Sequence, residues 1–242
     1  MKNYSKFILL FLSLLPITSC LFATSVNAYM FGHKVMILAA NSVGDTYFPA
    51  KGYFEFWGWE VTTAGLTPSV TSCYNTNPRP VPVNTLISEV NNNTLFQYDC
   101  IFIPSGGHWS ALLNDPTTLN LLVNAYNLGL IISSLCIGIR VLAAADIVDG
   151  VRISYDVNSA TQVTAAGGIT VDERVVIDQR IVTGTTGGGP TGGGASRAPT
   201  IEVCEALSTL ISSRNLTVSI VIVGVTAVAL TGLIVFIKRK ER

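Results

Sequence analysis

Continuous apolar runs alternate with helical patterns along most of the chain. Residues 34–40 (KVMILAA) and 130–135 are rich in branched aliphatic side chains, as in parallel strands that are covered on both faces. Segments 60–66 and 96–107 are predicted as further strands, the latter ending in a glycine pair. The regular alternation of strands with helices predicts an α/β domain whose mostly parallel sheet has helices on both faces.

Helical periodicity lies between these runs. A first helix is expected from near Pro49 to Gly58, and short helices over 83–92 and 138–147. A longer one begins after Asp115-Pro116 and ends at Gly129. Short strands are expected over 151–157, 168–178 (broken by a turn) and 180–186, followed by a closing helix over 198–213. The connection 67–83, rich in Pro, Asn, Ser and Thr, is predicted to be irregular.

Both ends of the chain differ from this domain. Residues 1–28 have a lysine-containing start, a short apolar core and small residues before Ala28, which predicts a secretory signal peptide. The competing interpretation is a lipoprotein box, ITSC, that would lipidate Cys20. Residues 216–237 carry no charge over 22 positions, about 33 Å of helix and enough to span a bilayer.

The basic tail KRKER (238–242) follows that span directly. Under the positive-inside rule the tail is cytoplasmic, so residues 29–215 are expected outside a cell membrane as a single-pass, membrane-anchored domain. That region holds nine Lys/Arg against fourteen Asp/Glu, a net charge of −5, with its basic residues scattered singly. This charge pattern argues against nucleic acid as a partner.

Cysteine spacing excludes the common metal patterns. Cys73, Cys100, Cys136 and Cys204 fit no zinc or CxxC spacing, so no metal is expected. An exported location permits disulfides, but the pairing of Cys73, Cys100 and Cys204 does not follow from sequence. Two sequons, at Asn92 and Asn215, predict N-glycosylation in a host that performs it.

The Gly-rich segment 184–196 (GTTGGGPTGGGAS) is interpreted as a flexible loop. It lacks the GK[ST] ending of a phosphate-binding P-loop and does not join an early strand to a helix. No cofactor is expected.

One cysteine stands where a strand turns directly into a helix. In LCIGIR, Cys136 follows the strand 130–135 and Gly138 follows two residues later, where a side chain would crowd the turn. A residue at such a junction projects above the carboxyl edge of the sheet, close to N–H groups that stabilise an anion. A thiol at such a turn has its thiolate favoured and is exposed enough to react; a single cysteine in an apolar strand is more often a small core residue, so the spacing alone leaves both interpretations open.

Three stretches together, FIPSGGHWSALLNDP, GLIISSLCIGIRVLAAADIVDG and ERVVIDQRIVTG, resemble the ThiJ/PfpI (DJ-one) superfamily. The similarity runs from Lys34 to about Ser213, and the GGH…DP run looks closest to the heat-shock glyoxalase and chaperone branch. The resemblance implies a glutamine amidotransferase-like (flavodoxin-like) sandwich, small carbonyl or peptide substrates and a homodimer.

The resemblance also implies roles for individual residues. Cys136 takes the nucleophile position, and the N–H groups of Gly107 and Ile137 form an oxyanion hole. Asp45 stands where the family commonly has a glutamate that hydrogen-bonds the cysteine, with a solvated surface charge as the alternative. His108 and Tyr155 are candidate pocket residues.

Departures from the family pattern limit the functional prediction. Ile137 replaces the histidine of protease-like members, which argues against a Cys-His peptidase. Two functions stay open: a cysteine-dependent hydrolase or lyase of the glyoxalase, deglycase or amidase kind, and a catalytically degenerate redox-sensing or binding module. The substrate is not predictable from the sequence.

Overall fold

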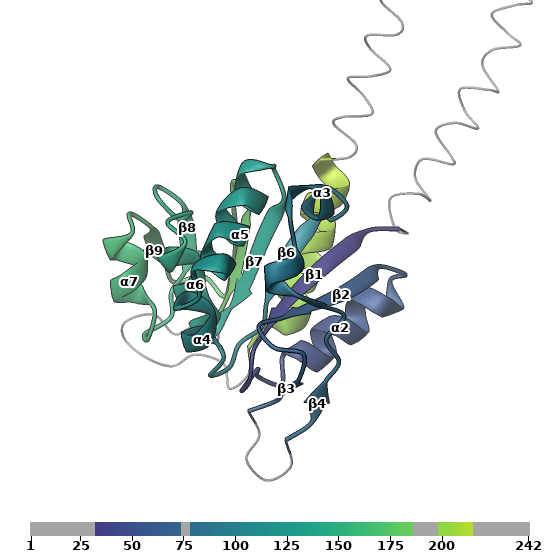
Figure 1. Cartoon of the computed structure of the whole chain (residues 1–242). Helices are drawn as coiled ribbons and strands as arrows, with labels where there is room; N and C mark the ends of the chain where they lie inside the picture. Colours follow the sequence, from purple (N-terminus) through teal and green to yellow (C-terminus); the bar gives the residue numbers. More distant parts are fainter. Residues whose placement is uncertain (1–31, 74–77, 186–197, 215–242) are drawn as a thin grey trace, which may run out of the picture. The chain divides into compact units, whose positions relative to one another are not determined.

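The computed structural model describes residues 32–73, 78–185 and 198–214 (Figure 1). The predicted signal peptide, Cys20, the predicted span 216–237, the basic tail and residues 186–196 of the Gly-rich loop lie outside these ranges. Within the described ranges, no helix combines the length and the apolar character that a membrane crossing requires.

A seven-stranded sheet forms the centre of the domain. All its neighbouring strands pair in parallel except the edge pair β10–β11, which is antiparallel. In spatial order the strands are β10 (Val175–Asp178), β11 (Ile181–Gly184), β7 (Ile131–Leu135), β6 (Cys100–Ile103), β1 (Lys34–Ala39), β2 (Glu60–Gly65) and β5 (Thr85–Leu86). The predicted mostly parallel sheet is thereby confirmed.

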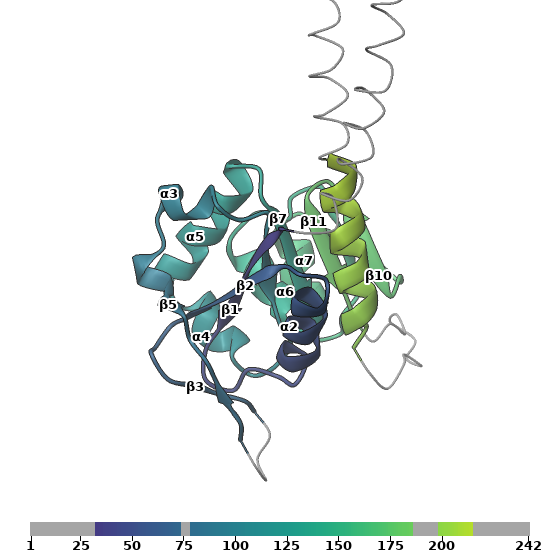
Figure 2. The ribbon, with the colours of Figure 1, turned by 90° about the vertical axis from the view of Figure 1, so that its right-hand side faces the viewer.

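Helices cover both faces of this sheet. Figure 2 shows α2 on one face and α4, α5 and α6 on the other. The helices are α2 (Tyr47–Phe56), α3 (Asn92–Leu95), α4 (Trp109–Leu113), α5 (Pro116–Asn127), α6 (Ile139–Ala144), α7 (Ala160–Ala165) and one over residues 200–214, with 3-10 turns η1 (Ile87–Glu89) and η2 (Cys136–Gly138). The predicted arrangement of helices on both faces is confirmed.

The apolar strands are explained by burial on two sides. Phe102 of β6 packs edge-to-face on Phe54 of α2, with ring centroids 5.6 Å apart. Its neighbours Ile101 and Ile103 belong to the larger core on the opposite face, together with Leu122 of α5. Successive side chains of a strand point to opposite faces of the sheet. Because both faces are covered here, the side chains on each face are apolar.

The start of α5 follows from its capping residues. The Asp115 carboxylate accepts hydrogen bonds from the Thr118 backbone N–H (2.8 Å) and hydroxyl (2.7 Å). Pro116 occupies the first turn, where a missing N–H costs no hydrogen bond. The predicted helix after Asp115-Pro116 is therefore confirmed.

Segment 83–92 differs from the prediction of one short helix. Thr85 and Leu86 pair with β2 as the edge strand β5, and the Glu89 carboxylate accepts the Leu86 N–H (3.0 Å) across η1. Asn91 then caps α3 through the Thr94 N–H (3.2 Å). Edge pairing to β2, a tertiary contact, overrides the local helical pattern.

Two small sheets flank the main one. The antiparallel pair β3 (Val70–Thr71) and β4 (Pro80–Val81) lies within the connection that was expected to be irregular. The parallel pair β8 (Arg152–Ser154) and β9 (Ile169–Val171) is joined by α7, a helix that the sequence pattern did not predict. The broken strand over 168–178 is confirmed as β9 and β10.

Candidate active site

The turn at Cys136 is sharp and conformationally strained. β7 ends at Leu135 in extended conformation, and Cys136 then has φ +49° before η2 and α6 begin. This left-handed conformation costs a non-glycine residue about 1–2 kcal/mol. It places Cys136, which is half-buried, at the carboxyl edge of the sheet. The predicted strand-to-helix junction is thus present at this residue.

Gly138 allows α6 to begin close beside the sheet. A methyl group at this position would lie 2.7 Å from Ser134 Oγ and 3.0 Å from the Pro104 carbonyl oxygen. Both distances are shorter than normal van der Waals contacts. The prediction that a side chain here would crowd the turn is confirmed.

Two further loops end at the same sheet edge. Because β7, β6 and β1 are neighbours, the segments after β6 and β1 lie beside each other. The Gly44 N–H donates to the Ser105 carbonyl (2.7 Å), and the Ser105 N–H donates to Thr46 Oγ1 (2.9 Å). The hydroxyls of Thr46 and Ser105 are also 2.9 Å apart. These contacts hold the loop that carries Asp45 against the loop that carries Gly107.

Gly106 makes this close approach possible. Its φ is +119°, and a Cβ on it would come within 2.1 Å of the Gly44 nitrogen. Only glycine combines that backbone conformation with that contact. Gly106 also bridges Val43 in antiparallel fashion, which fixes the position of the next residue, Gly107.

The two predicted oxyanion donors lie in the segments that follow β6 and β7 at this sheet edge. Gly107 is exposed, and its N–H donates no hydrogen bond within the described part of the chain. Ile137 stands in the first turn after Leu135, where backbone N–H groups have no partner inside the helix. The oxyanion hole itself stays a prediction.

Asp45 makes an ion pair that the sequence did not indicate. Its Oδ1 lies 3.5 Å from Arg79 Nη2, and about half of each side chain is exposed. The Arg79 guanidinium also stacks on Phe48, 3.5 Å from the ring centroid. The described contacts of Asp45 thus run toward Arg79, and its role as proton partner of Cys136 stays a prediction. No sequence motif signals Arg79, which lies 34 positions away.

His108 is a buried, neutral group. Its ring is fully buried, and Nε2 lies 2.8 Å from the Pro104 carbonyl oxygen. Burial lowers the pKa of His108 to about 4, with backbone hydrogen bonds opposing part of the shift. At neutral pH the ring therefore carries no charge, and its expected place in a pocket stays a prediction.

Tyr155 lies beyond the end of β8. Its backbone N–H donates to the Val171 carbonyl (2.8 Å), and its carbonyl accepts the Thr185 hydroxyl (2.7 Å). These bonds tie the β8–β9 sheet to the end of β11. A pocket role for the half-buried Tyr155 side chain also stays a prediction.

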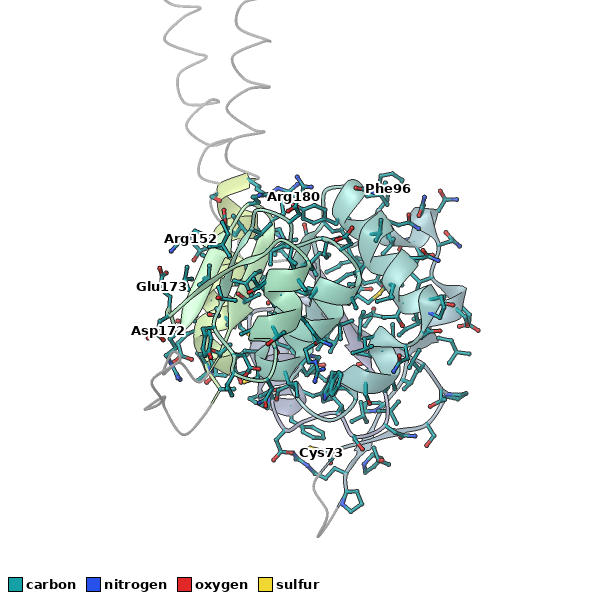
Figure 3. All side chains as sticks on the ribbon, turned by 90° about the vertical axis from the view of Figure 1, so that its left-hand side faces the viewer. Cys73, Phe96, Arg152, Asp172, Glu173 and Arg180 are labelled. Carbon is teal, nitrogen blue, oxygen red and sulfur yellow. The ribbon has the colours of Figure 1, made fainter. Side chains whose placement is uncertain are left out.

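The remaining cysteines of the described ranges contrast with Cys136. Cys100 and Cys204 are buried, and burial raises the pKa of both thiols. Cys73 is half-buried just after β3, on the loop side of the β3–β4 hairpin, and Figure 3 shows it at one end of the domain. None of these three cysteines is in a disulfide.

Within the described ranges no three His, Cys, Asp or Glu side chains gather as metal ligands would.

One contact near the site was not foreseen from the sequence. The Arg140 guanidinium of α6 stacks on Trp109 at the start of α4, 3.8 Å from the ring centroid. It also hydrogen-bonds Gln162 of α7. Arg140 thereby connects the helix that follows Cys136 to the helix that follows His108.

The fold and the junction at Cys136 define the class: an α/β sandwich with a cysteine at the sharp turn that follows a central strand. The DJ-1/PfpI family profile matches residues 33–191. The chain belongs to the DJ-1/PfpI family.

Solved structures show the same fold at low sequence identity. A ThiJ/PfpI domain protein from Brachyspira murdochii superposes with a TM-score of 0.60 at 20% identity, covering 75% of this chain and 96% of that one. Drosophila melanogaster DJ-1beta gives 0.59 at 19% identity, covering 75% and 91%.

A two-domain protein from Anabaena variabilis, with DJ-1/ThiJ/PfpI-like and ferritin-like domains, gives a TM-score of 0.61 at 21% identity. The match covers 75% of this chain but only 48% of that protein. A search of curated proteins found no match.

Proposed function

We propose that the chain is a membrane-tethered, extracytoplasmic DJ-1/PfpI domain whose Cys136 thiolate attacks small carbonyl or amide substrates. The observation that carries this proposal is the left-handed φ of +49° at Cys136, at a strand-to-helix junction. A cysteine in the core has no need of such a conformation, and strained residues of this kind cluster at functional sites.

The reaction is written for methylglyoxal, a small dicarbonyl. The thiolate sulfur bonds to the aldehyde carbon while the C=O π electron pair moves to oxygen as an alkoxide. The N–H groups of Gly107 and Ile137 stabilise that negative charge. A proton then moves from this carbon to its neighbour through Asp45, leaving a thioester. Water hydrolyses the thioester to lactate and restores the thiol, so the net change is the addition of one water molecule.

The extracytoplasmic placement is part of the proposal. It rests on the apolar start of the chain, the uncharged stretch 216–237 and the basic tail, which together are typical of a secreted domain with a C-terminal anchor.

Cysteine alkylation tests the chemistry. With iodoacetamide at pH 7, resolved per residue by mass spectrometry, Cys136 is expected to react at least tenfold faster than half-buried Cys73. Buried Cys100 and Cys204 are expected to react slowest. A Cys136 rate no greater than that of Cys73 would reject an activated thiolate.

Turnover separates an enzyme from a module that only senses or binds. Methylglyoxal consumption by the full chain is expected to be lost in Cys136→Ser. The second candidate, a redox-sensing module, is favoured by one observation: Ile137, which follows the cysteine, cannot accept a proton, and the lowered pKa of buried His108 makes its ring a weak base. Fast alkylation without turnover, and sulfenic acid at Cys136 after hydrogen peroxide, would select that candidate.

A further inference from the structure

A concave site lies on a face that the Cys136 chemistry does not use. A groove of about 540 Å³ opens between α3 and α5. α3 ends shortly before β6 begins, so this wall of the groove is near the amino ends of the strands, whereas Cys136 follows the carboxyl end of β7. Its volume falls within the range of about 300–1,000 Å³ that is usual for small-ligand sites.

Side-chain amides dominate the lining of the groove. The polar residues are Asn91, Asn92, Asn93, Thr117, Asn120 and Asn124. On α5, the last three are spaced i, i+3 and i+7, which puts them on one helix face opposite α3. Among the described residues that line the groove, none is charged. A phosphate, a carboxylate or an ammonium group would find no counter-charge there.

Most of these amides are available to a ligand. Asn91 caps α3 through the Thr94 N–H. The side chains of Asn92, Asn93, Asn120 and Asn124 are exposed and hydrogen-bond to no other described residue. Each amide offers donors and an acceptor together.

Asparagine is also a costly choice at exposed helix positions. Asn120 and Asn124 lie in the body of α5, where Lys, Glu or Ala would favour the helix by about 0.5 kcal/mol each. Neither side chain caps a helix or bonds the backbone within the described ranges. Folding stability therefore gives no reason for them, whereas ligand binding does.

The floor of the groove is apolar. Val90, Leu95 and Leu121 complete the lining. Phe96, next to Leu95, is 67% exposed, and Figure 3 shows it at the end of the domain opposite Cys73. Amides above an apolar floor match a molecule that has hydroxyl groups at its edges and C–H groups on its faces.

The geometry points to a binding site for a neutral saccharide between α3 and α5. Neighbouring hydroxyls hydrogen-bond the amides of α3 and α5, and the C–H face of the sugar ring lies against half-buried Val90, because Leu95 and Leu121 are only 1% and 4% exposed. The site is independent of the chemistry at Cys136.

Calorimetry with the full 242-residue chain tests the site. The chain is produced in bacteria, which leaves Asn92 unmodified, and is kept in an amine-oxide detergent because that detergent has no sugar headgroup. The probes are maltotriose, cellotriose and chitotriose, with trigalacturonic acid as the charged comparison. Saturable binding is expected for at least one neutral trisaccharide, and weaker binding for the acid. No saturable binding by any neutral probe, or tighter binding of the acid, would overturn the assignment.

Variants of α5 locate the binding. Asn120→Ala with Asn124→Ala is expected to weaken the Kd at least tenfold, and alanine favours the helix, so folding is preserved. Asn127→Ala, on the same helix but outside the groove, is the matched control and is expected to bind as the native chain does. Asn93→Ala provides a second test from α3. Undiminished affinity in both groove variants would refute the site.

Discussion

Gly138 lies so close to Ser134 that a methyl group on it would come within 2.7 Å of the Ser134 hydroxyl oxygen. The same methyl would be 3.0 Å from the Pro104 carbonyl oxygen and 3.3 Å from Ile103 Cγ2. The first turn after Cys136 is therefore packed directly on the ends of β7 and β6. Gly138 thus adjoins the strained residue Cys136, begins the helix that follows it and contacts the neighbouring loop at Pro104.

Substitution of Gly138 tests this packing. Gly138→Ala is expected to lower the free energy of unfolding by about 1–3 kcal/mol, because the added methyl overpacks the contact. Gly52→Ala is the matched control: Gly52 lies inside α2 with open space around its Cα. That change is expected to stabilise the domain by up to about 1 kcal/mol. Urea unfolding measures both, and equal effects at the two positions would contradict the packing.

The backbone conformation of Cys136 gives a second prediction. Both Cys136→Gly and Cys136→Ala remove the thiol, but only glycine tolerates φ +49° without strain. The glycine variant is expected to be more stable than the alanine variant by about 0.5–1 kcal/mol, after allowing for the greater chain entropy of unfolded glycine. If urea unfolding shows the alanine variant to be the more stable, the backbone at residue 136 does not keep its left-handed conformation and the prediction is wrong.

His108 makes stability depend on pH. Its folded-state pKa of about 4 lies below the ordinary value of 6.5, so between these values the unfolded chain binds a proton that the folded chain does not. The contribution of neutral His108 to the free energy of unfolding is fully present above pH 6.5. It is lost as pH falls toward 4, a change of about 3 kcal/mol. His108→Gln is expected to show a smaller loss of unfolding free energy between pH 7 and pH 4.5. Identical pH profiles would exclude His108 as the cause.

Variants of Asp45 and Arg79 distinguish two roles of the Asp45 carboxylate, proton transfer in turnover and ordering of the loop through the ion pair. If Asp45 moves the proton in turnover, Asp45→Asn is expected to lower kcat by about 10²–10⁴-fold. Arg79→Gln removes the partner of a half-exposed ion pair together with the stacking on Phe48, and is expected to change kcat less than tenfold. Matched losses in the two variants would indicate that the pair only orders the loop.

Glycosylation of Asn92 tests on which side of the membrane the domain lies. Asn92 is exposed at the start of α3, so in a eukaryotic secretory host it is expected to carry a glycan, seen as an added mass that an amidase removes. Thr94→Ala abolishes the sequon yet keeps the N–H that Asn91 caps. An unmodified Asn92 in chain that has inserted into the membrane of the secretory pathway would contradict the expected placement of residues 29–215 on its non-cytoplasmic side. Asn215, the second sequon, lies outside the described residues.

Much of the fold was predictable because strands that are buried on both faces appear in the sequence as continuous apolar runs. β1 and β6 are runs of apolar residues, and Asp115-Pro116 and Gly129 mark the ends of the helix α5 that lies between β6 and β7. Where a tertiary contact decides the structure, prediction failed. Thr85 and Leu86 read as part of a helix, yet they pair with the edge of β2.

The elbow was predictable for a similar reason: a strand, a cysteine, a glycine and a helix follow one another within a few residues. Asp45, by contrast, contacts an arginine that the irregular 67–83 connection brings back over α2. Contacts between loops that are far apart in sequence leave no local pattern. The same holds for Arg140 and Trp109.

Several hydrogen bonds join the loop after β1 to the loop after β6, so that the two loops form one structural unit. Ser42 accepts the His108 N–H, Gly44 donates to Ser105, and Thr46 holds the Ser105 backbone. Evolution therefore has little freedom to reposition Asp45 without also displacing Gly107. If the proposed chemistry holds, a change of substrate is therefore expected to come from the elements that surround this unit, while Asp45 and Gly107 keep their relative positions.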